Sequence, residues 1–143
     1  MMTTKKYLRW IVLTNVLMAL SINTTATYLS GGDTVAGWVK GCALAFTINT
    51  VWAAILPMDR IGKWFAESLL KFKTGSVGEF FARNFIVNAI YVTIISFTVA
   101  LVNVGINGSL ISVWFQTYPI LHLVGLVTSL VIEKPVQKIT LMF

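Results

Sequence analysis

The chain has 143 residues, of which 57% are hydrophobic and 11% are charged, and its mean hydropathy is +0.81. A soluble domain carries about 25% charged residues, so this composition excludes a soluble protein and places the chain in the membrane class. The single cysteine, Cys42, excludes an intrachain disulfide and cannot alone make a thiolate metal site. The length accommodates about four membrane helices of about 20 residues. We therefore expect one integral membrane domain over residues 1–143.

The first apolar segment, Leu8–Leu29, predicts a membrane helix, with a secretory signal as the competing interpretation. Lys5 and Lys6 precede the apolar run, and "TTA" at Thr24–Ala26 has the small residues of a cleavage site. We expect the segment to be retained as a span. At 1.5 Å per residue its length matches a hydrocarbon core of about 30 Å, and in lipid only a helix satisfies every backbone group of such a segment.

A second span, Trp38–Leu56, is followed by Pro57, which we expect to stop the helix. The connection over residues 58–76 is too polar to span and has two faces at helical spacing. Its predicted ion pairs are Lys63–Glu67 and Glu67–Lys71. The segment is therefore predicted to be an amphipathic helix in the membrane interface, linking the two halves. Its expected contacts with the lipid surface are Arg60, Lys63, Lys71, Lys73, Phe65 and Phe72.

The third and fourth spans, Phe81–Val102 and Val113–Ile132, complete an all-α four-transmembrane-helix bundle. Pro135 follows the fourth span as a second expected helix stop. The halves 8–57 and 81–138 share an order of features: a Gly-containing outer loop, a Trp (Trp38 or Trp114), and a Pro beside charges. We therefore predict a tandem repeat of two helix pairs, related by an axis along the membrane normal.

The basic residues are strongly asymmetric about these spans. Ten of the eleven fall on one side, and only Lys40 falls on the other. The positive-inside rule then predicts that both termini and the middle connection are cytoplasmic. A net charge of +6 arranged in this way favours anionic lipid headgroups as partners and not nucleic acid. The ten are Lys5, Lys6, Arg9, Arg60, Lys63, Lys71, Lys73, Arg83, Lys134 and Lys138.

The second half carries a family resemblance. "LVNVGINGSLISVW" (Leu101–Trp114) and "EKPVQKI" (Glu133–Ile139) resemble a two-span domain of small bacterial membrane proteins, catalogued as a domain of unknown function. The resemblance implies a tandem version of that unit in a bacterial plasma membrane, and brings no known activity. Four-helix proton-coupled drug-efflux proteins are a weaker comparison, because they rely on a carboxylate within the membrane. Here the acidic residues are expected in loops or at span ends: Asp33, Asp59, Glu67, Glu79 and Glu133.

Polar residues gather at helical spacing inside the apolar spans. The only histidine, His122, shares a face with Tyr118, Gly125, Ser129 and Glu133. Interhelical hydrogen bonds explain such residues, but an ionisable group in a span is also a functional candidate, and His122 would be the proton carrier if there is one. We expect His122 to point into the bundle, with an Asn, a Tyr or a backbone carbonyl of another span as partner. The candidate intramembrane polar seam is His122, Tyr118, Ser129, Asn15, Asn49, Asn88, Asn84 and Tyr91.

Two function classes follow from these features. No nucleophile–base–acid set, Gly-rich phosphate loop or carboxylate pair is recognisable, and one His with the distant Cys42 gives too few metal ligands. An enzyme is therefore not expected, and neither is a cofactor or a metal. The first class is a small transporter or lipophile-handling protein, with a homodimer or a membrane partner protein completing it. The second is a non-transporting accessory or scaffold protein that binds a partner or anionic lipid. Polar side chains facing a wet cavity would favour the first class, and polar side chains consumed in helix–helix bonds would favour the second.

Overall fold

The computed structural model describes residues 3–29, 31 and 34–143. Every regular element in this part of the chain is helical, which confirms the all-α prediction. The elements are α1 (Thr4–Leu29), α2 (Val35–Ile55), α3 (Met58–Lys63), a π-helical turn η1 (Trp64–Leu69), α4 (Val77–Val104) and α5 (Leu110–Met142). Four of these helices, α1, α2, α4 and α5, are long and apolar enough to cross a membrane. The chain is therefore a multi-pass membrane protein.

The starts of two spans are fixed by side-chain caps. Thr34 accepts a hydrogen bond from the backbone of Gly37 at the start of α2, and Ser76 accepts one from Glu79 at the start of α4. Each cap satisfies a backbone N–H that has no partner within the helix. At the other end of α4, Gly105 has a φ of 78°, a left-handed conformation that glycine adopts without strain.

Helix α5 is longer than the sequence predicted, because Pro135 does not stop it. The helix continues through Pro135 to Met142. Proline removes one backbone hydrogen bond of the helix, but the residues beyond it are well packed: Val136 is 2% exposed and Thr140 is 1% exposed. Packing of this last segment along α1 therefore outweighs the local preference of proline to end a helix.

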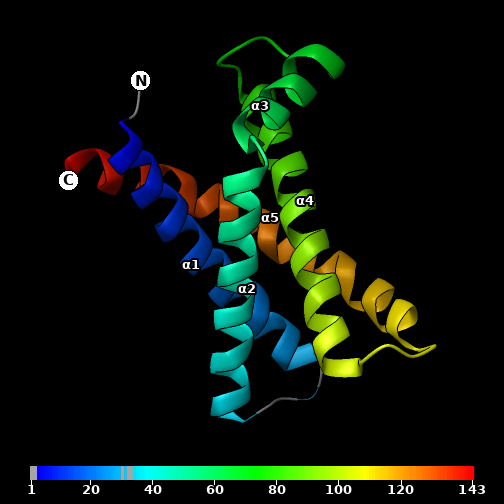
Figure 1. Cartoon of the computed structure of the whole chain (residues 1–143). Coiled ribbons are helices and arrows are strands. Elements are labelled where there is room, and N and C mark those ends of the chain that lie inside the picture. The colour runs from blue at the N-terminus through cyan, green and yellow to red at the C-terminus, as the bar shows by residue number, and fades with distance from the viewer. Residues whose placement is uncertain (1–2, 30, 32–33) are drawn as a thin grey trace.

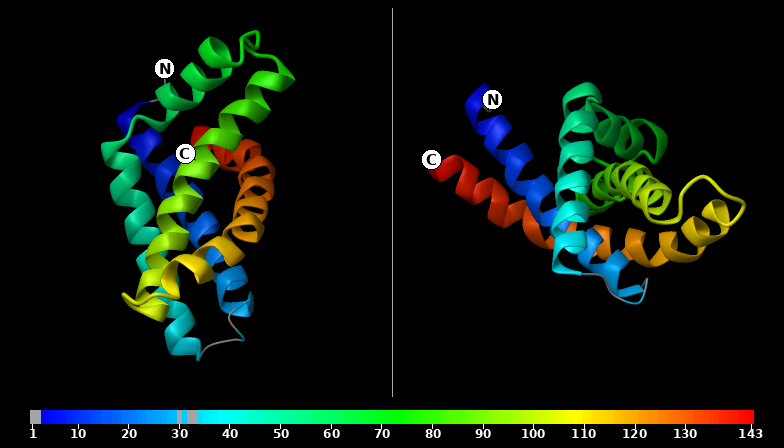
Figure 2. Two further views of the ribbon diagram at one scale, coloured as in Figure 1. Left: turned by 90° about the vertical axis from the view of Figure 1, so that its right-hand side faces the viewer. Right: turned by 60° about the horizontal axis from the view of Figure 1, so that its bottom comes forward.

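Helix α5 holds the bundle together, since it packs extensively against both α1 and α4. In Figure 1 it crosses obliquely behind α2 and α4. Helix α2 packs against α1 and, over a smaller area, against α4. The two ends of the described chain lie side by side (Figure 2), where Lys6 Nζ donates to the carbonyl of Leu141 at 3.2 Å. The buried centre is Met18, Ala19, Ile22, Ala45, Val92, Ile95, Val99 and Leu121.

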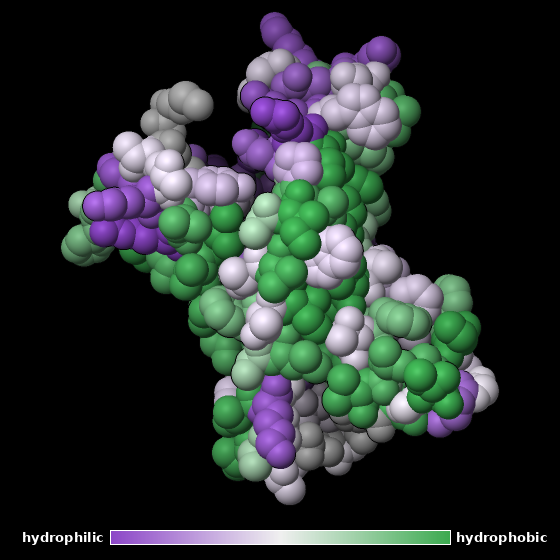
Figure 3. All heavy atoms as spheres, viewed as in Figure 1, coloured by the Kyte–Doolittle hydropathy of each residue, from purple (hydrophilic) through white to green (hydrophobic). Residues whose placement is uncertain are grey.

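The outer surface suits a hydrocarbon solvent. Large apolar side chains face outward along every long helix, among them Val12, Val51, Phe85 and Val127. In the space-filling view, apolar side chains cover the middle of the molecule, and hydrophilic ones gather around α3 and around the termini (Figure 3). A soluble protein would not expose so continuous an apolar surface.

The α3–η1 segment differs in detail from the predicted linker helix. It is helical over residues 58–69 only, and the described ion pairs do not include Lys63–Glu67 or Glu67–Lys71. The π turn has a wider i→i+5 spacing, seen where the backbone N–H of Leu70 donates to Phe65 at 3.0 Å, so residues four apart no longer share a face. Lys71 lies beyond the helix with a φ of 60°, and Glu67 accepts a hydrogen bond from Thr74 at 3.0 Å instead.

Candidate functional site

The predicted polar seam separates into two groups in the structure. Five of its members line one pocket between α1, α4 and α5, whereas His122, Tyr118 and Asn49 lie outside that pocket. The five lining members are Asn15, Asn84, Asn88, Tyr91 and Ser129. The candidate seam is thus divided between a pocket and other helix contacts, because helix crossing angles set which faces meet, and spacing along one helix does not specify those angles.

The pocket has a volume of about 480 Å³, and the first residues of α3 cover one end of it. Apolar atoms make up most of its wall. Its inner end, nearer the middle of the helices, is formed by Met18, Asn88, Tyr91 and Ser129. Its outer end, near α3 and the termini, is formed by Tyr7, Trp10, Met58, Asp59, Arg83, Asn84, Glu133 and Gln137, and the wall between is Ile11, Thr14, Asn15, Val87 and Ile132.

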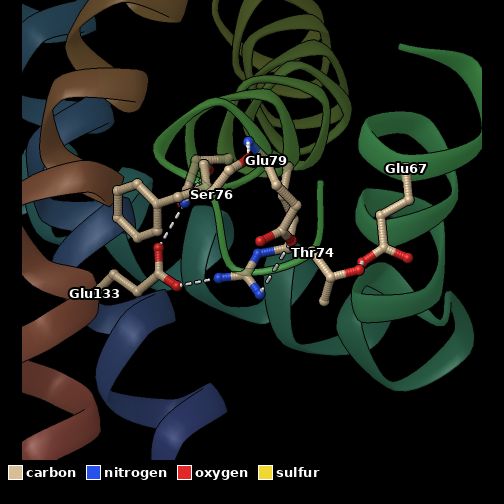
Figure 4. A network of polar contacts seen from close by, with 8 residues as sticks. Glu67, Thr74, Ser76, Glu79 and Glu133 are labelled. Carbon is tan, nitrogen blue, oxygen red and sulfur yellow. Dashed lines mark hydrogen bonds and ion pairs between the residues drawn. The ribbon is translucent and has the colours of Figure 1, made fainter. Parts of the chain in front are cut away.

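Charged side chains line the outer end of the pocket, and two of them belong to a network of polar contacts that includes Glu79 and Glu133 (Figure 4). Glu133 of α5 accepts hydrogen bonds from Arg83 Nη2 and Asn84 Nδ2 of α4, each at 2.6 Å. The same guanidinium lies 3.9 Å from a carboxylate oxygen of Glu79, which is 6% exposed. Glu133 lies within α5, because the helix continues past it to Met142. A carboxylate pair thus shares one arginine on the pocket wall.

Asp59 contributes a further carboxylate from the first turn of α3. No hydrogen bond or ion pair joins it to any other residue in the described part of the chain, and it is exposed. Two stacked aromatic rings of α1, Tyr7 and Trp10, lie on the same wall, with ring centroids 6.1 Å apart and planes inclined by 23°. Tyr91 of α4 adds a third aromatic side chain toward the inner end. Two carboxylates and the two stacked rings of α1 therefore share the outer end of the pocket.

Asn88 connects the pocket wall to the helix crossing behind it. Its Nδ2 donates to the backbone carbonyl of His122 at 3.0 Å and lies 3.4 Å from the Nδ1 atom of the imidazole ring of His122. Its Oδ1 has no hydrogen-bond partner among the described residues and lies over Gly125, where an added Cβ would approach it to 2.6 Å. The glycine lets α4 and α5 approach closely, and the amide bridges them.

A matching arrangement joins α1 to α2. Asn23 is 3% exposed and donates to the carbonyl of Trp38 at 3.0 Å, while its Oδ1 would clash with a Cβ added at Gly41. In both cases the accepting carbonyl belongs to the residue three before the glycine. Asn23 was not among the predicted residues, and the small residue Gly41 on the next span is the signal that could have found it.

His122 lies at the crossing of α4 and α5 and does not line the pocket. Its ring stacks on Tyr118 at 5.8 Å and meets Phe85 edge to face at 5.1 Å. Tyr118 and Thr93 share a hydrogen bond of 3.0 Å between their hydroxyl groups. The histidine thus points into the bundle and has an Asn of another span as its neighbour, as expected, and it is surrounded by helix–helix contacts.

Asn49 is separate from both groups. It is 1% exposed, and neither atom of its amide has a hydrogen-bond partner among the described residues. An unpaired buried amide costs about 1–3 kcal/mol, so this residue weakens the α2 packing where it lies.

Comparisons with known proteins identify no relative: no family model, no curated protein and no solved structure matches the chain. Among the described residues, no group of three or more His, Cys, Asp or Glu side chains could hold a metal ion. The pocket lining offers a ligand hydrogen bonds, charged groups and apolar contact.

Proposed function

We propose that this protein binds a small amphiphilic molecule within the membrane and acts as a small transporter or lipophile-handling protein. The observation that carries the proposal is the pocket of about 480 Å³ between α1, α4 and α5. Ligand pockets in proteins are commonly about 300–1,000 Å³, mostly apolar, with a few polar groups that orient the ligand. This pocket fits that description, and its charged groups lie at one end only, which matches a molecule with a polar head and an apolar body.

The proposal includes a place and an orientation. The basic residues around α3 and the termini support a cytoplasmic location for that end in a bacterial plasma membrane, with anionic headgroups as neighbours. Exposed Trp64 and Phe72, beside exposed Lys63 and Lys71, support an interfacial position for the α3–η1 segment and the turn after it. These features support a position for the outer end of the pocket near the level of the lipid headgroups.

The tandem repeat is also a proposal, and one pair of contacts supports it. The indole of Trp38 donates to Thr24 at 3.0 Å, and the indole of Trp114 donates to Ser96 at 2.9 Å. In each half, the tryptophan near the start of the second helix is thus bonded to a hydroxyl group on the first helix. A homodimer or a membrane partner protein would extend the small bundle.

The alternative is an accessory or scaffold protein without a ligand. The contacts of Asn23, Asn88, Tyr118 and Trp114 favour it, because these polar side chains are engaged in helix–helix bonds. The pocket argues for the first proposal, since a scaffold does not require a cavity lined by a charged cluster.

Thiol accessibility separates the two functions. In a Cys42→Ser background, Ser129→Cys would place a thiol on the pocket wall, and Val92→Cys, at a position 0% exposed and outside the pocket, is the matched control. In membranes we expect a small charged methanethiosulfonate reagent to modify the pocket position and leave the control unmodified. Equal protection of both positions would mean that the pocket is closed to water, and would favour the scaffold.

A further inference from the structure

We infer that the pocket selects amphiphiles with a positively charged head, such as an organic ammonium or phosphonium group. This inference rests on the proposed ligand-binding function and names the class of ligand. It depends on the juxtaposition of the carboxylates of Asp59 and Glu133 with the aromatic rings of Tyr7 and Trp10 at one end of an otherwise apolar pocket.

Formal charge at the outer end of the pocket is negative, although the surrounding surface is basic. One guanidinium, that of Arg83, faces the two carboxylates of Glu79 and Glu133, at 3.9 Å and 2.6 Å. Its charge is therefore more than balanced, and it is not available to an anionic head. Asp59 adds a carboxylate without a partner among the described residues. With three carboxylates and one guanidinium, the cluster attracts a cation and repels an anion.

The aromatic side chains strengthen this preference. A cation over the face of Trp or Tyr is attracted by the negative face of the ring, by about 0.5–1 kcal/mol at exposed sites and about 2 kcal/mol when desolvated. Trp10 and Tyr7 stand in a stack on α1, and Tyr91 stands on α4. Organic cations shed water more easily than metal ions, so a site of this kind suits a substituted ammonium or phosphonium.

The rest of the pocket suits the apolar part of such a molecule. Beyond the charged end the wall includes Ile11, Met18, Val87 and Ile132, with methionine able to adapt to irregular shapes. Polar atoms are few on this part of the wall. Ser129 Oγ already donates to the carbonyl of Leu126 at 2.9 Å, whereas Thr14 Oγ1 and Asn88 Oδ1 have no partner among the described residues.

Binding of tetraphenylphosphonium tests the inference, measured by equilibrium dialysis with the protein in phosphatidylcholine nanodiscs and corrected for empty nanodiscs. Tetraphenylborate, an anion of the same shape, is measured in a separate titration. We expect the cation to bind and the anion not to bind. Asp59→Asn with Glu133→Gln should weaken binding of the cation by about tenfold or more, since two attractive charges are lost. Trp10→Leu should weaken it severalfold.

Two controls keep the outcomes separate. Glu67→Gln removes a carboxylate outside the pocket and should leave binding unchanged. Ser129→Trp should fill the pocket and abolish binding of any ligand. Glu133→Gln removes an ion-pair partner of Arg83 and could reduce the yield of folded protein. In that case Asp59→Asn alone still tests the charge, because Asp59 makes no hydrogen bond or ion pair in the described part of the chain.

Each result then decides one claim. Preference for the anion, or cation binding that is insensitive to Asp59→Asn and to the double variant, would overturn the inference. If either probe still binds in a way that Ser129→Trp abolishes, the proposed function survives without the charge selectivity. If neither probe shows binding that depends on Ser129, the pocket takes neither ligand. Both the inference and the proposed function then fail for these probes, and the scaffold is favoured.

Discussion

The close crossing of α4 and α5 at Gly125 predicts a large effect from a single methyl group. In Gly125→Ala the new Cβ would lie 2.6 Å from Asn88 Oδ1 and 2.7 Å from Val92 Cγ2, side chains that are 1% and 0% exposed. Overpacking of this kind costs about 1–3 kcal/mol, and a displaced Asn88 loses an interhelical hydrogen bond worth about 0.6–2 kcal/mol. Alanine recovers up to about 1 kcal/mol of helix propensity. We expect a net loss of about 1–3 kcal/mol in the free energy of unfolding.

The single cysteine provides the assay for this prediction. Cys42 is partly buried on α2, so a fluorogenic maleimide reports unfolding as SDS is added to mixed micelles. Gly108→Ala is the matched control, because a Cβ there would meet nothing within 4 Å, and we expect it to change stability by no more than about 0.5 kcal/mol. Equal stability of Gly125→Ala and Gly108→Ala would refute the reasoning that the helix crossing at Gly125 has no room for a methyl group. The double variant with Asn88→Ala should lose less than the sum of the two single losses.

Three further predictions concern the ring, the topology and the interface. His122→Gln should fold and keep ligand binding, with a stability loss below about 1 kcal/mol, because the ring lies outside the pocket and an amide can remain near Asn88. Loss of binding with normal folding would show a functional histidine. In a cysteine-free background, Asn107→Cys should be labelled from outside intact cells and Thr3→Cys should not, and the reverse pattern would invert the proposed orientation. Replacing Phe65 and Phe72 together by Ser should speed proteolysis of the residues 58–76 in membranes; an unchanged rate would mean that these rings do not hold the segment.

The four spans could be predicted from the sequence because lipid leaves little choice. An apolar run of about 20 residues must be a helix, and the predicted runs all fall inside α1, α2, α4 and α5, apart from the capping residue Leu56 after α2. An Asn was likewise among the partners expected for His122, since a buried imidazole has few polar side chains within reach on the other spans.

The pocket was less accessible to sequence reasoning, and the reasons are local. Pro135 predicted a helix end that tertiary packing overrides, so the predicted helix ended close to Glu133 and the bond between Glu133 and Arg83 was not predicted. The π turn at η1 changed the rotation of the linker helix and removed the predicted pairs of Glu67. The aromatic and acidic lining combines α1, α3, α4 and α5, and no periodicity within one helix specifies how four helices cross.

The extensive packing of α1 against α5 has a consequence for biogenesis. Helix α1 is made first, yet a large part of its interface belongs to a helix that begins at Leu110, so roughly eighty residues must be inserted before that partner exists. Until then the polar face of α1, with Thr14 and Asn15, lacks the cover of α5, although Asn15 can already make its 3.4 Å contact with Thr50 of α2. Non-local partners slow folding and prolong such exposure. Truncation before α5 should therefore leave α1 as an inserted but unassembled span, open to membrane quality-control proteases.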